Sequence, residues 1–320
     1  MVAVLRVENL KKTFPSVRRF FGPNRAAHTA VDDISFTVAE AEILGLLGPN
    51  GAGKTTTVQM LLSTMQPTSG NIFYFDQDFT THRSEILGSV GFASTYAKLP
   101  ERLTVRSNLR MYGRLYGLSS RHIEQRIDHC LTFFGMQQRA DTEVGVLSAG
   151  ETTRVVLAKA FLANPKIVIL DEPTASLDPE VAQDVRHFVL RQRQEFGTSF
   201  LITSHNMTEV SQLCDRVLIL KNGRIIDDST PAQLAHRIGN TRVVLEIEHG
   251  LDAAITYTQQ QELPYSVTSN TLEITVNEQA IAQLLTSLSR SNVEYCQISI
   301  EKPTLEDYFL HLLRTSSGVL

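Results

Sequence analysis

Apolar runs of strand length recur along the chain, and segments with helical spacing of apolar residues separate them. Three strand-like segments lie near the N-terminus: VLRVENL (4–10) and VDDISFTV (31–38), which mix apolar and polar residues, and EILGLLG (42–48), which is mostly apolar. Three more lie in the second half: KIVILDEP (166–173), TSFLITSH (198–205) and RVLILKNGRIID (216–227). Uninterrupted apolar runs joined by helical segments are typical of parallel strands buried on both faces of a sheet. We therefore expect an α/β fold with a parallel sheet.

The middle of the chain follows a different pattern. Residues 106–135 and 151–163 carry apolar residues at helical spacing, for example Leu109 and Tyr112. We interpret this region as a helical insert with bounds near residues 86–165.

The last part of the chain has a pattern of its own, which begins after a shift in composition. Over residues 242–315 the order is strand, helix, strand, strand, helix, strand, helix. Asn277 is placed to cap the second of these helices. Its apolar face comprises Ile281, Leu284, Leu285 and Leu288. The order βαββαβ with a trailing helix predicts a small ferredoxin-like α+β domain. We expect two domains, at residues 4–236 and 241–315.

Composition is that of an ordinary soluble globular protein, with 42% apolar and 20% charged residues. The net charge of −4 gives no footprint for nonspecific nucleic-acid binding, so we expect no nucleic-acid partner. The three cysteines form no CxxC pair, which disfavours a zinc ribbon or a disulfide framework. No run approaches the roughly 20 apolar residues that cross a bilayer, and the first residues lack the apolar segment of a signal peptide. Any membrane role therefore has to come through a partner.

The segment GPNGAGKTT (48–56) lies between an apolar strand and a helical segment and has the spacing of a phosphate-binding loop. Its glycines allow successive N–H groups to point at phosphate oxygens, and the helix N-terminus adds a positive dipole. Lys54 can reach the β- and γ-phosphates, and the Thr55 hydroxyl can bind Mg²⁺. The expected nucleotide contacts are Gly48, Pro49, Asn50, Gly51, Ala52, Gly53, Lys54, Thr55 and Thr56. This loop alone leaves kinases, GTPases, motor proteins and transporters open.

Candidate catalytic groups lie at the ends of two predicted strands. Asp171 and Glu172 end KIVILDEP at the carboxyl edge of the sheet, where α/β proteins place their ligands. Asp171 is suited to hold Mg²⁺ through water, and Glu172 to orient or deprotonate an attacking water. His205 ends the strand FLITSH on the same edge, within reach of a γ-phosphate.

A second turn of small residues, LSAGE (147–151), opens onto a helix. Ser148 and Glu151 have the spacing of a capping box. Ala149 and Gly150 would allow a partner surface to approach the backbone, and a helix N-terminus is itself an anion site. We expect this turn to grip a nucleotide held by a second copy of the sheet domain.

These residues together resemble the ATP-binding subunit of an ABC transporter. GPNGAGKTT resembles the Walker A motif, and IVILDEP resembles the Walker B motif with its catalytic glutamate. LSAGE resembles the signature motif of the family. Ser176 to Asp178 resemble the D-loop, and His205 resembles the switch histidine. The resemblance covers residues 4–236 and implies a P-loop NTPase fold, with a RecA-like core sheet and a helical signature subdomain. The tail ISIEKPTLEDYFLHLLR is similar to the C-terminal extension of bacterial drug, polysaccharide and sodium exporter ATPases.

The resemblance also implies partners and roles. Two ATPase domains would close head to tail around two ATP molecules, with Ser148 and Gly150 contacting the γ-phosphate in trans and Asp178 coupling the sites. The second domain would be another copy or a homologous ATPase subunit. Phe14 is the expected adenine-stacking residue, and Phe20 and Phe21, in the polar loop that follows, are alternatives.

The sequence departs from the family pattern at three places. The signature has Ala149 and Glu151 in place of a glycine and a glutamine, and Glu40-Ala41-Glu42 replaces a turn with a central glycine. The glutamine of the Q-loop would fall near Thr95, whose side chain is too short to bridge Mg²⁺ and a transmembrane partner in the same way. Tyr96 and Lys98 are possible substitutes.

The function that we predict is ATP hydrolysis that drives a separate transmembrane permease, in an exporter, from the cytoplasmic face of the inner membrane. One alternative is a soluble ABC ATPase that acts on ribosomes or nucleic acid. It is disfavoured because the chain has a single phosphate loop, no heptad run and a net negative charge. A second alternative, a nucleotide-dependent regulatory module without turnover, is disfavoured by the presence of Glu172 and His205. The transported substrate and the role of the C-terminal domain are not determined by the sequence.

Overall fold

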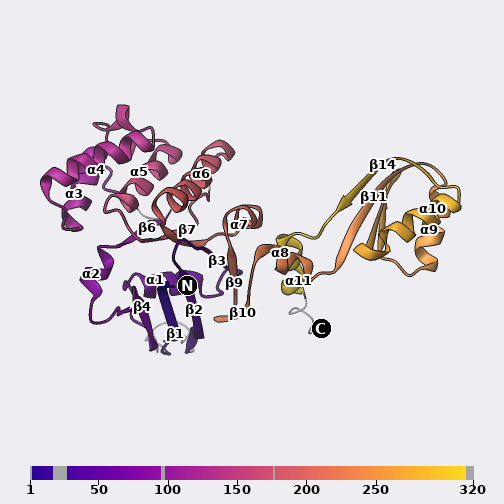
Figure 1. Ribbon diagram of the computed structural model, residues 1–320, viewed down its shortest axis with the longest axis horizontal. Helices are drawn as coiled ribbons and strands as arrows, with labels where there is room; N and C mark the ends of the chain where they lie inside the picture. The colour runs from indigo at the N-terminus through magenta and orange to yellow at the C-terminus, as the bar shows by residue number, and fades with distance from the viewer. Residues whose placement is uncertain (1, 17–26, 95–97, 176, 315–320) are drawn as a thin grey trace, which may run out of the picture. The chain divides into compact units, whose positions relative to one another are not determined.

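The computed structural model describes residues 2–16, 27–94, 98–175 and 177–314 (Figure 1). The chain divides into two compact units, Met1–Thr230 and Pro231–Leu320, each with its own hydrophobic core. Residues 231–236 were predicted to belong to the first domain. They form helix α8 (Pro231–His236), which lies in the second unit because it packs against α11 (Leu305–Arg314).

A six-stranded sheet in the order β10-β9-β3-β8-β7-β6 forms the centre of the first unit. Its strands are β3 (Ile43–Leu47), β6 (Val90–Ser94), β7 (Ile167–Asp171), β8 (Ser199–Thr203), β9 (Arg216–Lys221) and β10 (Arg224–Ser229). All neighbouring strands are parallel except β9 and β10. Every residue of β3 and β8 is buried, as is every residue of β7 before Asp171, which explains the uninterrupted apolar runs. The prediction of a buried parallel sheet is confirmed.

The run RVLILKNGRIID is a hairpin and not a single strand. β9 ends at Lys221 and pairs antiparallel with β10 across a turn at Asn222 and Gly223. Both turn residues have positive φ, 51° and 79°, which is the backbone of a tight hairpin turn and suits the Asn-Gly pair. The Asn-Gly pair was the signal in the sequence from which this turn could have been predicted.

A second, antiparallel sheet in the order β2-β1-β4-β5 packs with α1 (Lys54–Leu61) against the first. Its strands are β1 (Ala3–Phe14), β2 (His28–Ala39), β4 (Ser69–Tyr74) and β5 (Gln77–Asp78). The buried ring of Tyr74 spans the two layers, since its hydroxyl donates to the Leu61 carbonyl at 3.0 Å. Strands β4, β5 and β6 were not predicted individually, because they are short and each contains at most three apolar residues.

Helices cover the β6 and β7 side of the sheet, as Figure 1 shows. The pattern at 106–135 corresponds to two helices, α3 (Val105–Leu115) and α4 (Ser120–Phe133), with Ser119 as the N-cap of α4. The remaining helices of the unit are α2 (Arg83–Leu87), α5 (Ala149–Phe161), α6 (Pro179–Phe196) and α7 (Met207–Leu213). The segment 86–165, interpreted as a helical insert, also contains β6, which pairs with β7 in the sheet.

The second unit is built on a four-stranded antiparallel sheet in the order β12-β13-β11-β14. Its elements are β11 (Asn240–His249), α9 (Leu251–Gln260), β12 (Tyr265–Thr268), β13 (Thr271–Asn277), α10 (Ile281–Arg290), β14 (Glu294–Glu301) and the trailing α11. In chain order this sheet reads 2-3-1-4, which is the ferredoxin-like arrangement, so that prediction is confirmed. Asn277 caps a 3₁₀ turn that leads into α10, and Ile281, Leu284 and Leu288 are buried in the core.

No helix within the described residues is both long enough and apolar enough to cross a bilayer.

Lys159 is a buried cation on α5. It is 7% exposed, and its Nζ lies 5.7 Å from the ring centroid of Phe92 and 5.3 Å from that of Tyr112. Burial lowers the pKa of Lys159 from 10.5 to about 8, because water no longer solvates the ammonium. The contacts with the aromatic rings offset only part of this desolvation.

We predict that Lys159→Met stabilises the protein at pH 7 by about 1–2 kcal/mol. Between pH 8 and 10.5 the unfolded chain retains a proton that folded Lys159 has released, so the wild type gains stability as pH rises. The advantage of the variant should therefore shrink towards pH 10. Urea unfolding midpoints at pH 7 and 9.5 measure this. The control is Lys166→Met, since Lys166 is exposed and lies over Phe75 at 5.1 Å. An advantage of Lys159→Met that is equal at both pH values would contradict the prediction.

Candidate functional site

The phosphate loop joins β3 to α1, and close packing requires glycine at two of its positions. Gly53 has φ 110°, and a Cβ there would lie 2.4 Å from the carbonyl oxygen of Ala30. A Cβ on Gly48 would lie 2.2 Å from the carbonyl oxygen of Leu220. Helix α1 begins directly after the loop, so its first free N–H groups face the space that the loop encloses. Backbone from neighbouring segments therefore fixes the course of the loop.

The half-buried side chain of Lys54 folds over this loop. Its Nζ donates to the carbonyl oxygen of Gly48 at 2.5 Å and to that of Pro49 at 3.3 Å. Burial lowers the pKa of Lys54, while the carboxylates of Glu172 and Asp171 act in the opposite direction. The two carboxylates therefore favour the charged ammonium, which is the form that binds phosphate.

A cavity of about 650 Å³ lies beside the loop, between α1, β6 and the end of β7. Its lining brings together five residues that the sequence predicted: Asn50, Lys54, Thr55, Asp171 and Glu172. The volume is within the range of small-molecule sites. The first turn of α1 and the carboxyl end of β7 thus supply positive and negative groups to one hollow.

The end of β7 is held to the end of β8 by polar contacts. The Thr203 hydroxyl donates to Asp171 Oδ1 at 2.6 Å. The Glu172 N–H donates to the Thr203 carbonyl oxygen at 3.0 Å and also to the Thr203 hydroxyl oxygen at 3.1 Å. Glu172 adopts φ 54°, a left-handed conformation that costs about 1–3 kcal/mol for a residue with a side chain. The hydrogen bonds from its backbone N–H to Thr203 hold it there.

His205 lies in the turn between β8 and α7, because β8 ends at Thr203. The sequence predicted it at the end of the strand itself. Its Nδ1 is 2.6 Å from Glu172 Oε2, and its side chain is 72% exposed whereas that of Glu172 is 15% exposed. The imidazole therefore stands at the solvent side of the carboxylate and contacts it directly.

The hydroxyl of Thr55 and the carboxylate of Asp171 are the oxygen ligands that Mg²⁺ prefers. Both residues line the same cavity. Within the described part of the chain no group of three or more His, Cys, Asp or Glu side chains could hold a metal. This donor set fits an ion that takes its other ligands from phosphate and water, as Mg²⁺ usually does.

The LSAGE turn is the N-terminus of α5, and its capping box is present as predicted. Ser148 Oγ accepts from the Glu151 N–H at 3.2 Å, and the Ser148 N–H donates to Glu151 Oε2 at 2.9 Å. Hydrogen bonding from the Ser148 backbone, together with Arg139 at 2.8 Å, lowers the pKa of Glu151. A Cβ on Gly150 would make only ordinary contact with Val181, so packing within this chain does not require glycine there.

The remaining predicted site residues lie outside the lining of the cavity, as do Ser148 and Gly150. Phe14 is at the end of β1, 37% exposed, with Lys12 Nζ 5.4 Å from its ring centroid. Asp178 is exposed and precedes α6 without a side-chain capping bond. Lys98 is exposed. Several residues named in the sequence analysis lie outside the described residues: Phe20, Phe21, Thr95, Tyr96 and Ser176.

Two hydroxyl residues that flank Asp171 across the sheet were missed by reasoning from the sequence. Ser94 and Thr203 are the register partners of Asp171 in β6 and β8. Both are buried, and Ser94 lines the cavity. The available signal was a hydroxyl residue at the end of each strand that adjoins KIVILDEP.

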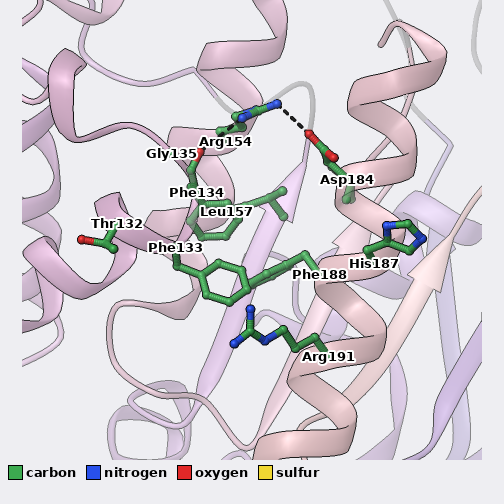
Figure 2. Close-up of a pocket in the computed structure, with 11 residues that line it drawn as sticks. Thr132, Phe133, Phe134, Gly135, Arg154, Leu157, Asp184, His187, Phe188 and Arg191 are labelled. Atoms are coloured by element: carbon green, nitrogen blue, oxygen red, sulfur yellow. Dashed lines mark hydrogen bonds and ion pairs between the residues drawn. The ribbon is translucent and has the colours of Figure 1, made fainter.

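A second hollow of about 340 Å³ lies between α4, α5 and α6, apart from the phosphate loop (Figure 2). Its floor is formed by the rings of Phe133, Phe134 and Phe188. Figure 2 shows Arg154 and Asp184 bridging its edge, in an ion pair of 2.7 Å. This hollow shares no lining residue with the cavity beside the phosphate loop.

Comparison with known families and proteins agrees with this geometry. Residues 31–175 match the model of the ABC transporter family. The Nod factor export ATP-binding protein I of Bradyrhizobium diazoefficiens is 36% identical over 233 residues, which are 72% of this chain and 74% of the relative. The linearmycin resistance ATP-binding protein LnrL of Bacillus subtilis is 29% identical over 97% of this chain and 98% of its own length. That similarity extends through the second unit.

Solved structures share the fold of the first unit. The ATP-binding subunit of an ABC transporter superimposes with a TM-score of 0.65 at 26% identity, over 74% of this chain and 93% of that one. CbiO1 from Clostridium perfringens, described as part of an ABC transporter complex, has a TM-score of 0.61 at 26% identity, over 73% and 91%. These relatives do not support an action on ribosomes or nucleic acid. The chain belongs to the ABC transporter family, as an ATP-binding and ATP-hydrolysing subunit.

Proposed function

We propose that this chain hydrolyses ATP, with Mg²⁺, at the cavity beside the phosphate loop and thereby drives an export permease. The observation that carries the proposal is the contact of 2.6 Å between Glu172 and His205, next to a cavity that Lys54 also lines. It puts a carboxylate and an imidazole together where the γ-phosphate of a nucleotide on the loop would end.

Each group has a distinct task in the proposed reaction. Lys54 and the N–H groups of the loop neutralise the β- and γ-phosphates, and Glu172 orients the attacking water and accepts its proton. His205 hydrogen-bonds the γ-phosphate and keeps Glu172 in place. Thr55 and Asp171 would hold Mg²⁺, which supplies further positive charge at the phosphates. Phe14, at the end of β1, is the proposed stacking surface for adenine.

We further propose that two such domains enclose the nucleotides, with Ser148 and Gly150 reaching the γ-phosphate of the opposite subunit and Asp178 lying between the two sites. Three features support this arrangement. Ser148 and Ala149 of the LSAGE turn are exposed, the helix start is organised by the capping box, and the turn does not line the cavity of its own chain. The second domain is another copy of this chain or a homologous ATPase subunit.

Export is the proposed direction because the similar proteins are named for Nod factor export and for linearmycin resistance. The permease is a separate membrane protein, and this chain binds it at the cytoplasmic face of the inner membrane. Copurification from detergent-solubilised membranes with a polytopic protein tests this part of the proposal.

Glu172→Gln should reduce ATP hydrolysis by about 100-fold or more, because it removes the proton acceptor. ATP affinity should change less than about twofold, since the phosphate loop is untouched. Phosphate release and binding of a fluorescent ATP analogue measure the two quantities. Glu195→Gln, the same change at an exposed position on α6, should leave both unchanged. If the wild type shows no hydrolysis above background and Glu172→Gln does not differ from it, the alternative of a module without turnover is favoured; undiminished hydrolysis in Glu172→Gln would show that Glu172 is not the proton acceptor.

Ser148→Arg should abolish hydrolysis and ATP-dependent dimerisation, while the single subunit still binds ATP with nearly normal affinity. The large cation would block the approach of the turn to the opposite nucleotide. Ser119→Arg is the control, because the Ser119 hydroxyl also accepts from a backbone N–H at the start of a helix, α4, but has no proposed contact with a partner. Light scattering with ATP, together with turnover, gives the readout. Equal loss of ATP binding and hydrolysis would argue against a contact in trans.

Gly53→Ala should weaken ATP binding by about tenfold or more, because its Cβ would clash with the Ala30 carbonyl and its φ of 110° is strained for alanine. Gly117→Ala is the control: Gly117 also has positive φ, 74°, but no atom lies within 4 Å of the place that a Cβ would take. Titration with an ATP analogue compares the two variants. Similar affinities would show that the loop does not depend on this close approach.

A further inference from the structure

Glu209 is a carboxylate buried in α7, with 1% of its surface exposed. Its Oε2 accepts two hydrogen bonds, from Thr174 Oγ1 at 2.7 Å and from Ser204 Oγ at 2.9 Å. Its Oε1 is buried with no hydrogen-bond partner among the described residues. Burying a carboxylate is unfavourable unless its contacts compensate, so these two hydroxyls are its main support.

The two hydroxyls come from the two loops that carry the catalytic pair. Thr174 lies two residues after Glu172, in the turn that follows β7. A hydrogen bond of 3.2 Å from the Ala175 N–H to the Glu172 carbonyl oxygen also holds this turn. Ser204 directly precedes His205. One carboxylate oxygen therefore ties the loop of the proposed base to the loop of the proposed switch histidine.

Glu209 also closes a ring of hydrogen bonds around the backbone of His205. The Asn206 N–H donates to Ser204 Oγ at 3.0 Å, and the Glu209 N–H donates to Asn206 Oδ1 at 3.1 Å. Both neighbours of His205 are thus fixed, whereas its side chain is 72% exposed and contacts Glu172. The direction of the imidazole depends on how its backbone is held.

We propose that Glu209 is a positioning residue of the ATPase, which sets His205 against Glu172 by tying together the ends of the two loops. The inference rests on the roles proposed above for these two residues. Glu209 does not line the cavity and acts through His205.

Loss of the tie should reduce turnover and spare nucleotide binding. Displacing a catalytic group by roughly 1 Å costs up to about 100-fold, so Glu209→Ala should reduce kcat about 10- to 100-fold with KM for ATP changed less than about threefold. Glu209→Gln retains an acceptor oxygen at the right length and should restore most of kcat. Glu209→Asp, which is too short to reach both hydroxyls, should not. Glu195→Ala on the surface of α6 is the control.

A double-mutant cycle with His205→Ala shows whether the effect passes through the histidine. In the His205→Ala background, Glu209→Ala should reduce kcat by less than about twofold. Full additivity of the two losses would overturn the inference, as would a parallel rise in KM or equal activity of the Gln and Asp variants. Should Glu209→Ala not fold, Ser204→Ala and Thr174→Ala, each of which removes one bond, are used in the same cycle.

The outcomes also separate this inference from the proposed function. If His205→Ala leaves turnover intact, the catalytic role of His205 is wrong and the inference falls with it. If His205→Ala reduces turnover but the Glu209 variants do not, only the role of Glu209 is wrong.

Discussion

Parallel hydrogen bonding between β3, β8 and β7 is the constraint on which the rest of the site depends. Because the three strands run in the same direction, their carboxyl ends meet at one edge of the sheet. The phosphate loop, Asp171 with Glu172, and the turn with His205 are far apart in the chain, yet each follows one of these strands. The buried apolar strands thus bring the phosphate loop and the two carboxylates to one cavity, and they place His205 in contact with Glu172.

The polar groups at this edge are held by the backbone as much as by each other. Gly48 and Gly53 allow the phosphate loop to pass within contact of neighbouring carbonyls, and Thr203 fixes both Asp171 and the backbone of Glu172. Such prearranged groups stabilise developing charge without reorganising when the reaction occurs. The left-handed conformation of Glu172 is maintained by this network and directs its carboxylate to His205.

In the proposed function, one chain supplies half of the complete nucleotide site. The cavity contains the phosphate loop and the carboxylates, whereas the capped turn at Ser148 is exposed and lies outside its lining. Hydrolysis and subunit closure are therefore linked in the proposed function, since the nucleotide would be enclosed only when a second subunit contributes its turn. The ferredoxin-like unit has a separate core, and nothing in its fold is required to build the cavity.

The sequence by itself determined the features that depend on near neighbours. The capping box of Ser148 and Glu151, the glycines and lysine of the phosphate loop, and the apolar runs of β3, β7 and β8 are local patterns, and the structure contains each as predicted. The βαββαβ order of the last unit could also be predicted, because apolar residues recur at a different spacing in strands and in helices.

Only the tertiary structure decided which distant groups meet. Glu209 has the sequence position of an ordinary acidic residue in the first turn of a helix, and Thr203 that of a residue in an apolar strand. Their burial and their bonds to the end of β7 and to the turn after it arise from strand pairing and helix packing, because the bonded residues are 31 to 35 residues apart in the sequence. A local pattern carries no information about contacts over such separations.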